Sequence, residues 1–519
     1  MTIAYSSLIL SLERSVLTVQ ERGVSSSSPD NMSLPDGFKT PDDYFKEAIE
    51  FLREYSWIYQ EANTCFIKSK ILDKMPTEFQ KYFQNIDNTQ LNQFPHVHKP
   101  LNGIEGESLK GFRQRLCSLI PQEAYEDPPP LEEKINLKTD NFKKMNLKKR
   151  HEILRLAQAI HKQLQPNGVE QQQTCALIDF GCGLGYLSEI LYKLNDNYLI
   201  LGLESDPLRV LAAKKRLQEY MPQAKGSILY CQQFITDNSK DFISERVKEL
   251  LQSNYCQSKD TLRRPPPARQ AIIGLHACAD LTITSMKLFL HMAEVRHLVI
   301  MPCCYHKMEM CAATLKFCNF PLSRSLQKAV VSSQDGGDGD VINNYVKYLN
   351  RPFLRLACQQ TLKRWQNCSA EQHSLHGREM FLRAMAEALP RKETEIVVKC
   401  KEKINLLKEK ILDFNTFRQL YHLQSTKLVE ASMVDWSLEH EREFNALLEQ
   451  YPNGEKLAEG LTCLQTSIQK LCENLVLYDR LCFMQETAVD LKLNINVRYE
   501  KLMDEELSPR CYVLIAEKL

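Results

Sequence analysis

Neither sign of charge dominates this chain of 519 residues, because 66 Lys and Arg residues stand against 65 Asp and Glu residues and leave a formal net charge of +1. The chain as a whole offers no field that would attract nucleic acid or an anionic membrane, so any basic surface must be local. Long apolar runs are also missing, since none approaches the roughly 20 residues that cross a bilayer. We therefore expect a soluble protein without a membrane partner.

A basic segment is absent from the N-terminus, where the first residues are only mildly apolar and Glu13 and Arg14 follow, so we expect no signal peptide. The 18 cysteines are scattered through apolar segments, unlike those of small secreted domains. Both features favour an intracellular location, cytoplasmic or nuclear or both. The Ser- and Pro-containing stretch before the first helical pattern predicts a flexible leader at 1–40.

The most informative segment is LIDFGCGLGYLS at 177–188. Apolar residues lead into Asp179, glycines follow at 181, 183 and 185, and a helix-compatible run begins directly after them. This order predicts a strand, a tight turn and a helix N-terminus. Glycines without Cβ atoms let a ligand lie against the backbone, and a helix N-terminus attracts an anionic group. The segment therefore predicts a site for a small anionic cofactor.

The third glycine of a dinucleotide-binding fingerprint is absent, because Tyr186 stands where that motif requires glycine. A second apolar strand, 198–203, ends in Glu204, whose carboxylate can accept hydrogen bonds from two ribose hydroxyls. Asp-x-Gly-x-Gly-x-Gly followed by this acid resembles the S-adenosylmethionine site of class I methyltransferases. An ordinary strand-to-helix turn and a nucleotide-dependent oxidoreductase remain as alternatives.

This resemblance implies S-adenosylmethionine as the cofactor, bound beyond the carboxyl ends of parallel strands. The cofactor-binding residues that we predict are Lys149, Asp179, Gly181, Cys182, Gly183, Gly185, Glu204, Ser205, Gln233, Phe234 and His276.

Further strand patterns alternate with helical ones at 227–231, 271–276 and 296–302, and two β-rich runs at 491–498 and 511–516 close the chain. Strands separated by helices indicate βαβ units and a parallel sheet. We therefore predict an α/β fold with a seven-stranded, Rossmann-like class I methyltransferase sheet closed by a C-terminal hairpin.

The predicted organisation has four parts after the leader. They are a helical N-terminal region at 41–137, the methyltransferase domain in two parts at 138–340 and 470–519, and a helical insertion at 341–469.

Two segments rich in Cys and His follow the fourth and fifth predicted strands, GLHACADL at 274–281 and MPCCYHK at 301–307. Together with KKRHE at 148–152 and LSPR at 507–510, they resemble the methyltransferase-like protein 25 family. The first two segments are also similar to tRNA 2′-O-methyltransferases of the Trm-thirteen type. The chain has Ala279 and Pro302 where glycine is common in the family.

Titratable side chains in these segments are candidates for positioning or deprotonating the methyl acceptor. The predicted catalytic residues are His276, Asp280, His306 and Lys307. Thiolate and imidazole groups can also bind zinc, but the spacing is not that of a Cys-x-x-Cys pair, so we predict no metal and favour small side chains packed around the cofactor. The Asn/Asp-Pro-Pro-aromatic motif of amino-directed base methyltransferases is absent after the fourth strand.

The acceptor is less defined than the cofactor. A basic segment before the glycine strand favours RNA over protein, without DNA specificity, although a solvated face is the plainer interpretation. A protein methyltransferase and a methyltransferase-fold binding subunit without turnover remain as alternatives. The basic residues are Lys138, Lys143, Lys144, Lys148, Lys149 and Arg150.

Overall fold

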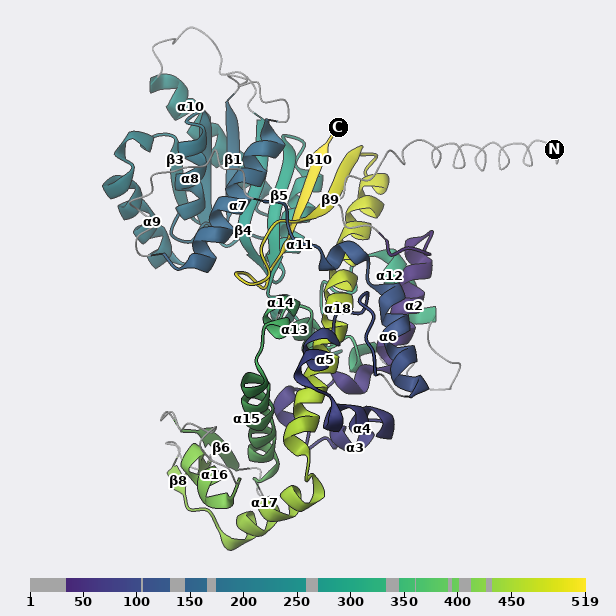
Figure 1. Ribbon diagram of the computed structural model, residues 1–519. Helices are drawn as coiled ribbons and strands as arrows, with labels where there is room; N and C mark the ends of the chain where they lie inside the picture. Colours follow the sequence, from purple (N-terminus) through teal and green to yellow (C-terminus); the bar gives the residue numbers. More distant parts are fainter. Residues whose placement is uncertain are drawn as a thin grey trace, which may run out of the picture.

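The computed structural model describes residues 34–103, 106–130, 145–165, 174–257, 269–332, 345–359, 361–390, 394–400, 412–425 and 432–519. Its main feature is a seven-stranded sheet with the order β3-β2-β1-β4-β5-β10-β9 (Figure 1). The strands are β1 (Cys175–Phe180), β2 (Tyr198–Glu204), β3 (Ile228–Gln232), β4 (Arg269–Cys278), β5 (Val295–Cys303), β9 (Ile495–Lys501) and β10 (Tyr512–Lys518).

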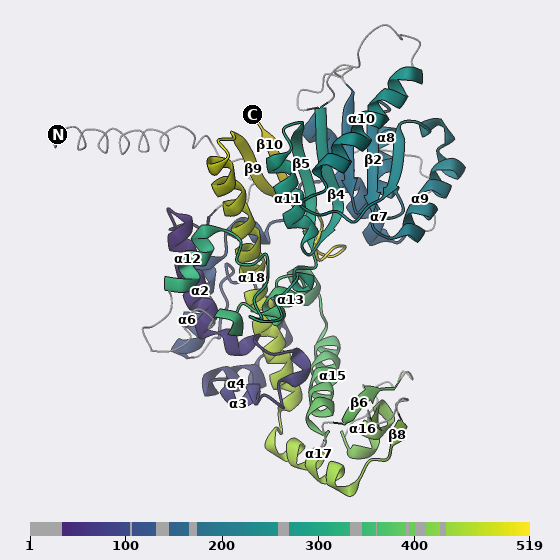
Figure 2. The ribbon, with the colours of Figure 1, turned by 180° about the vertical axis from the view of Figure 1, so that it is seen from behind.

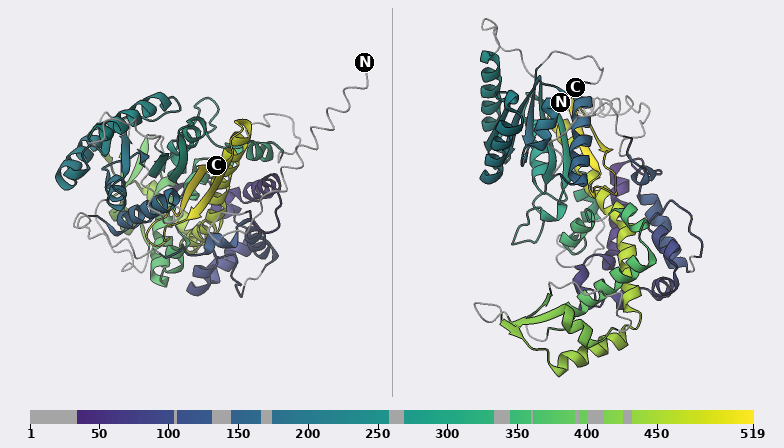
Figure 3. Two further views of the ribbon diagram at one scale, coloured as in Figure 1. Left: turned by 90° about the horizontal axis from the view of Figure 1, so that it is seen from above. Right: turned by 60° about the vertical axis from the view of Figure 1, so that its left-hand side comes forward.

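The central strand β1 is buried along its whole length and pairs in parallel with β2 and β4. At the far edge, β10 is antiparallel to both β5 and β9. The β9–β10 hairpin therefore closes the sheet, which confirms the predicted fold class. Helices lie on both faces of the sheet (Figure 3). They are α7 (Leu147–Leu164), α8 (Tyr186–Leu194), α9 (Pro207–Tyr220), α10 (Lys240–Gln257) and α11 (Leu281–His291).

The helix of 37 residues labelled α18 (Gly454–Asp490) runs through the rest of the molecule (Figures 1 and 2). Most of its side chains are buried on every side, as expected of a helix that passes through a core. It contacts β9 and α11 of the sheet domain and also the N-terminal helices. The domain boundary predicted between 469 and 470 falls inside this helix. Because the helix is buried on all sides, its sequence shows no helical alternation of apolar and polar residues from which its first residue could be predicted.

The N-terminal helices pack along α18. The apolar stripe of α2, which includes Tyr44, Phe45 and Leu52, is buried. The helices at 71–74 and 77–85 are separate, because Met75 takes an extended backbone before Pro76. The helices are α2 (Pro41–Glu54), α3 (Ile71–Lys74), α4 (Thr77–Asn85), α5 (Asn88–Gln93), α6 (Glu107–Leu119) and α12 (Arg324–Ser332), which lies beside α2.

The insertion is not helical throughout. A small antiparallel sheet of β6 (Glu395–Lys399), β7 (Tyr421–Ser425) and β8 (Ser432–Val434) lies far from the main sheet (Figure 1). Its strands are short and partly exposed, so they carry no clear alternation in sequence. The helices are α13 (Arg351–Leu356), α14 (Leu362–Gln366), α15 (Ala370–Ala388), α16 (Phe414–Leu420) and α17 (Leu438–Gln450).

Some predictions fall outside the described residues. They concern the leader up to residue 33 and the basic residues Lys138, Lys143 and Lys144. Within the described part of the chain, no helix has the combination of length and apolar character that a bilayer crossing requires.

Candidate active site

The glycine turn between β1 and α8 uses left-handed backbone at each of its glycines, with φ of 69° at Gly181, 58° at Gly183 and 79° at Gly185. Residues other than glycine rarely adopt this backbone conformation. A Cβ at Gly183 would meet only the Gly181 carbonyl oxygen, at 4.0 Å, whereas a Cβ at Gly185 would lie 2.2 Å from Tyr230 Oη. Gly183 therefore leaves space for a ligand, and Gly185 leaves space for the protein's own core.

Glu204 at the end of β2 holds this turn in place. One oxygen of its buried carboxylate accepts a hydrogen bond from the Gly183 N–H at 3.1 Å. The other oxygen accepts from the Asp206 N–H at 3.1 Å and from Ser205 Oγ at 3.3 Å. The acid that the sequence singled out thus contacts the glycine backbone directly.

Asp179 lies inside β1 and is also buried, and Ser188 Oγ donates a hydrogen bond to it at 2.9 Å. Burial raises the pKa of Asp179 to about 7, against the hydrogen bond from Ser188 and with a smaller contribution from Glu204. Asp179 therefore connects the glycine strand to the first turn of α8.

A cavity of about 1170 Å³ opens beyond the carboxyl ends of the strands. Most of the predicted cofactor residues line it: Lys149, Asp179, Gly181, Cys182, Gly183, Glu204, Ser205, Gln233, Phe234 and His276. Gly185 does not line the cavity. Its carbonyl oxygen accepts a hydrogen bond from the Tyr230 hydroxyl at 3.3 Å. The phenyl ring of Phe234 is largely exposed, so the cavity offers an unfilled aromatic surface.

The predicted catalytic residues separate into two pairs. His276 and Asp280 line the cavity, but His306 and Lys307 do not. His306 and Lys307 do not line the cavity because the chain turns into a short 3-10 helix at Tyr305–Lys307. There Tyr305 is buried and His306 Nδ1 lies 3.3 Å from Cys358 Sγ.

Asp280 has a structural task besides its place at the cavity. Its two carboxylate oxygens accept hydrogen bonds from the Glu309 N–H and from Asn319 Nδ2, both at 2.9 Å. These bonds tie the end of β4 to the loop that follows β5. Asp280 keeps further acceptor positions, so these two bonds orient its carboxylate without preventing a role as catalytic base.

Glu152 of α7 belongs to the site, although the sequence prediction gave it no role there. It is buried at the cavity wall, where Ser508 Oγ donates to it at 2.7 Å. His276 Nε2 lies 3.5 Å from its other oxygen, and Lys148 Nζ lies 3.8 Å from the first. Burial lowers the pKa of His276, and the charge of Glu152 opposes that shift. Glu152 belongs to the KKRHE motif and contacts Ser508 of LSPR and His276 of GLHACADL. The three motifs therefore pointed to this residue.

Basic side chains also line the cavity. Lys149 Nζ lies over the ring of Tyr186 at 4.1 Å, and burial together with Arg216 lowers its pKa. Lys148, Arg209, Lys287 and Arg510 complete this set. Arg510, from the LSPR motif, is a second residue that the prediction did not assign to the site.

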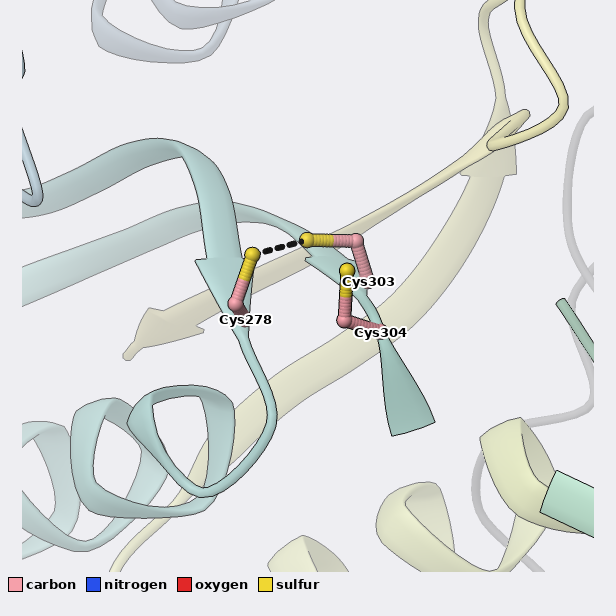
Figure 4. A group of neighbouring side chains, drawn as sticks. All are labelled: Cys278, Cys303 and Cys304. Atoms are coloured by element: carbon pink, nitrogen blue, oxygen red, sulfur yellow. Dashed lines mark hydrogen bonds between the residues drawn. The ribbon is translucent and has the colours of Figure 1, made fainter. Parts of the chain in front are cut away.

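Three cysteines gather at the ends of β4 and β5, with Cys278 Sγ at 2.8 Å from Cys303 Sγ and Cys304 close by (Figure 4). All of them line the cavity. The neighbouring thiols, together with Arg510 and Lys307, hold the pKa of Cys304 well below its usual range. The three cysteines and His276 thus line the same cavity.

Comparison with known proteins agrees with this geometry. Residues 148–311 match the family described as Methyltransferase domain. Proteins named probable methyltransferase-like protein 25 from Homo sapiens and Mus musculus are 25% and 24% identical over 251 and 257 residues. Each match covers 48% of this chain, and the chain spans 36% and 37% of the relatives' own lengths.

A solved structure titled as the plantazolicin methyltransferase BpumL in complex with SAH is 10% identical, and the match covers 62% of this chain and 82% of that one. Its TM-score of 0.19 is too low to support an argument. The chain thus carries a methyltransferase domain and resembles methyltransferase-like protein 25 over about half its length. The similarity to the Trm-thirteen type stays a prediction.

Proposed function

We propose that this chain is an S-adenosylmethionine-dependent methyltransferase whose cofactor site is the cavity beyond β1, β2 and β4. The observation that carries the proposal is the glycine turn. Gly183 lines the cavity, its Cβ position is nearly empty, and its N–H is oriented by Glu204. A backbone shaped in this way allows the close approach that a small cofactor needs.

The residues present fit this cofactor. Gly181 and Gly183 leave the backbone accessible, and the exposed ring of Phe234 provides an apolar surface for a heterocycle. A carboxylate offers about four acceptor positions, and Glu204 uses three of them within the protein, so it can still accept from a hydroxyl. S-adenosylmethionine supplies an activated methyl group when bound.

His276 and Glu152 are the pair that best fits a proton transfer from the acceptor. Because burial lowers the pKa of His276, its imidazole is neutral near pH 7. Since Nε2 faces Glu152, Nδ1 is the ring nitrogen that would accept the proton. Glu152, 3.5 Å away, stabilises the imidazolium that results. Ser508 orients the carboxylate from its other side.

We infer RNA as the acceptor class. The support is local charge, because Lys148, Lys149 and Arg510 line the cavity of a chain whose net charge is only +1. Lys and Arg side chains at a site entrance bind phosphates without reading sequence. A protein acceptor is the second candidate, since Asp237 and Glu309 also line the cavity and would attract a basic peptide.

Calorimetry of the full chain with S-adenosylmethionine, and separately with a nicotinamide dinucleotide, tests the cofactor. We expect binding of the first and none of the second. Failure to bind S-adenosylmethionine would favour a binding subunit without turnover, and binding of the dinucleotide would favour an oxidoreductase. Mass spectrometry of RNA and protein from cells that lack this chain then tests the acceptor class.

A further inference from the structure

Cys278, Cys303 and Cys304 form a compact group of sulfur atoms, hereafter the thiol cluster. Their Sγ atoms all lie within 4.8 Å of one another at the carboxyl ends of β4 and β5 (Figure 4). Among the described residues, this is the one group of three or more Cys, His, Asp or Glu side chains with such spacing. Cys303 is buried and the other two are half-buried. The cluster is therefore largely shielded from solvent, but a ligand in the cavity can contact it.

The backbone is bent to build this cluster. Successive side chains of a strand point to opposite faces, yet the sulfur atoms of Cys303 and Cys304 lie together (Figure 4). Cys304 achieves this with φ of 53°, in the left-handed region that residues other than glycine rarely occupy. Ala279, directly after Cys278, has the same φ, and its N–H donates to the Cys303 carbonyl at 3.0 Å. Two unusual backbone conformations thus hold both strand ends in register.

We propose that the thiol cluster binds a thiophilic divalent cation of the Zn²⁺ type through three thiolates. Binding forms three metal–sulfur bonds and releases to solvent the protons that the cysteines still carry. The fourth position of a tetrahedral site then faces the cavity, which all three cysteines line. Three protein ligands with one open position are the arrangement of reactive zinc sites, whereas structural sites use four.

The spacing allows this geometry with little movement. Zn–S bonds of about 2.3 Å place tetrahedral sulfur ligands about 3.8 Å apart. The cluster spans that separation, since its atoms lie within 4.8 Å and the Cys278–Cys303 pair at 2.8 Å needs only to open. The expectation of no metal was based on the missing Cys-x-x-Cys spacing, which a site assembled from two strands does not require.

The test uses the full chain, reduced and freed of metal by a chelator, in the absence of S-adenosylmethionine. Titration with Co²⁺ should produce thiolate-to-metal charge-transfer absorption that saturates at one equivalent, and Zn²⁺ should abolish it. Cys278→Ser and Cys304→Ser should each weaken binding more than about 100-fold, because even a second-shell change costs 10–100-fold. Cys311→Ser, an exposed cysteine in the loop after β5, should leave binding unchanged.

A second measurement avoids any variant that fails to fold. In the unmodified protein, Zn²⁺ should protect Cys278 and Cys304 from alkylation, mapped by mass spectrometry, while Cys311 stays reactive. The proposal is overturned if Cys304→Ser binds Co²⁺ as before, or if Zn²⁺ protects none of the three cysteines from alkylation. Because no cofactor is present, these outcomes are independent of the proposed methyl transfer.

Discussion

Glu204 both holds the glycine turn and can bind the cofactor, so one substitution would change both properties. Its carboxylate fixes the Gly183 N–H on one side and the Asp206 N–H, at the start of α9, on the other, each at 3.1 Å. A ligand hydroxyl would add to these bonds without replacing them. Loss of the side chain therefore affects the shape of the turn as well as any cofactor contact.

Replacing Glu204 with Ala should weaken S-adenosylmethionine binding by about 1–3 kcal/mol, because charge-assisted hydrogen bonds are lost. Calorimetry measures the affinity, and thermal unfolding shows whether the turn survives. Glu204→Gln is the control, since its amide oxygen can still accept from Gly183. It should keep most of the stability and lose affinity. Wild-type affinity in both variants would remove Glu204 from the cofactor site.

The charge of His276 is set by its surroundings, which makes its titration a direct probe of the site. Burial lowers its pKa, Glu152 raises it and Lys148 lowers it. Glu152→Gln should therefore move the pKa further down, and Lys148→Met should move it up. NMR of ¹³C-labelled histidine follows the titration, with the signal assigned by its loss in His276→Asn. A shift of the same sign in both variants would contradict the described contacts.

At the scale of the strand–turn–helix element, Gly183 and Gly185 form a matched pair. Both have left-handed backbone, so an Ala side chain costs about 1–2 kcal/mol at either position. Gly185→Ala should cost roughly 1–3 kcal/mol more, because its Cβ would overlap the hydroxyl of Tyr230. Gly183→Ala should instead weaken cofactor binding with a smaller loss of stability, because its Cβ would meet only the Gly181 carbonyl oxygen within the protein. Denaturant unfolding and calorimetry of the two variants measure this difference, and equal loss of binding at equal stability would contradict it.

The main sheet and the cofactor turn could be predicted because their signals are local. Buried parallel strands are continuous apolar runs, and a left-handed turn requires glycines at fixed offsets. Glu204 was found for the same reason, as the acid that ends an apolar strand. Its contact with Gly183 follows from the pairing of β1 with β2, where Phe180 lies opposite Leu203.

Other parts of the site depend on contacts between segments far apart in the chain. The position of Glu152 depends on α7, on His276 of β4 and on Ser508 before β10, and no local pattern joins these elements. The position of His306 could not be predicted, because the left-handed backbone at Cys304 redirects the chain. No sequence pattern marks a cysteine with that conformation. Strands β6 to β8 were missed because their side chains are only partly buried.

At the scale of the whole molecule, the last residues of the chain complete a sheet that begins at Cys175. β10 pairs with β5 through Leu514 opposite Ile300, and its side chains are almost fully buried. Truncation after Asp490 removes β9 and β10, which exposes the edge of β5 and one side of α18. The product should be insoluble or lack a cooperative thermal transition. A soluble truncated chain that melts cooperatively would show that the domain does not need this hairpin.

The charge distribution of the whole molecule gives the test of the acceptor. Replacing Lys143, Lys144 and Lys148 with Glu should weaken RNA binding for all sequences alike, because phosphate contacts position without reading bases. The slope of log affinity against log salt should fall by about 2, at roughly 0.7 for each lost contact with a single strand. Binding to labelled RNA over a salt series measures both effects.

The matched control is the double variant Lys214→Glu and Lys215→Glu, which changes two exposed lysines of α9 that do not line the cavity. It makes the net charge more negative in the same way, although with two substitutions against three, so a general electrostatic effect would appear in it at about two thirds of the size. Lys149 is left unchanged because we predict that it binds the cofactor itself. If the triple variant binds RNA and transfers methyl groups as the wild type does, these lysines are a solvated face. The carboxylates of Asp237 and Glu309 at the cavity would then favour a basic protein segment as the acceptor.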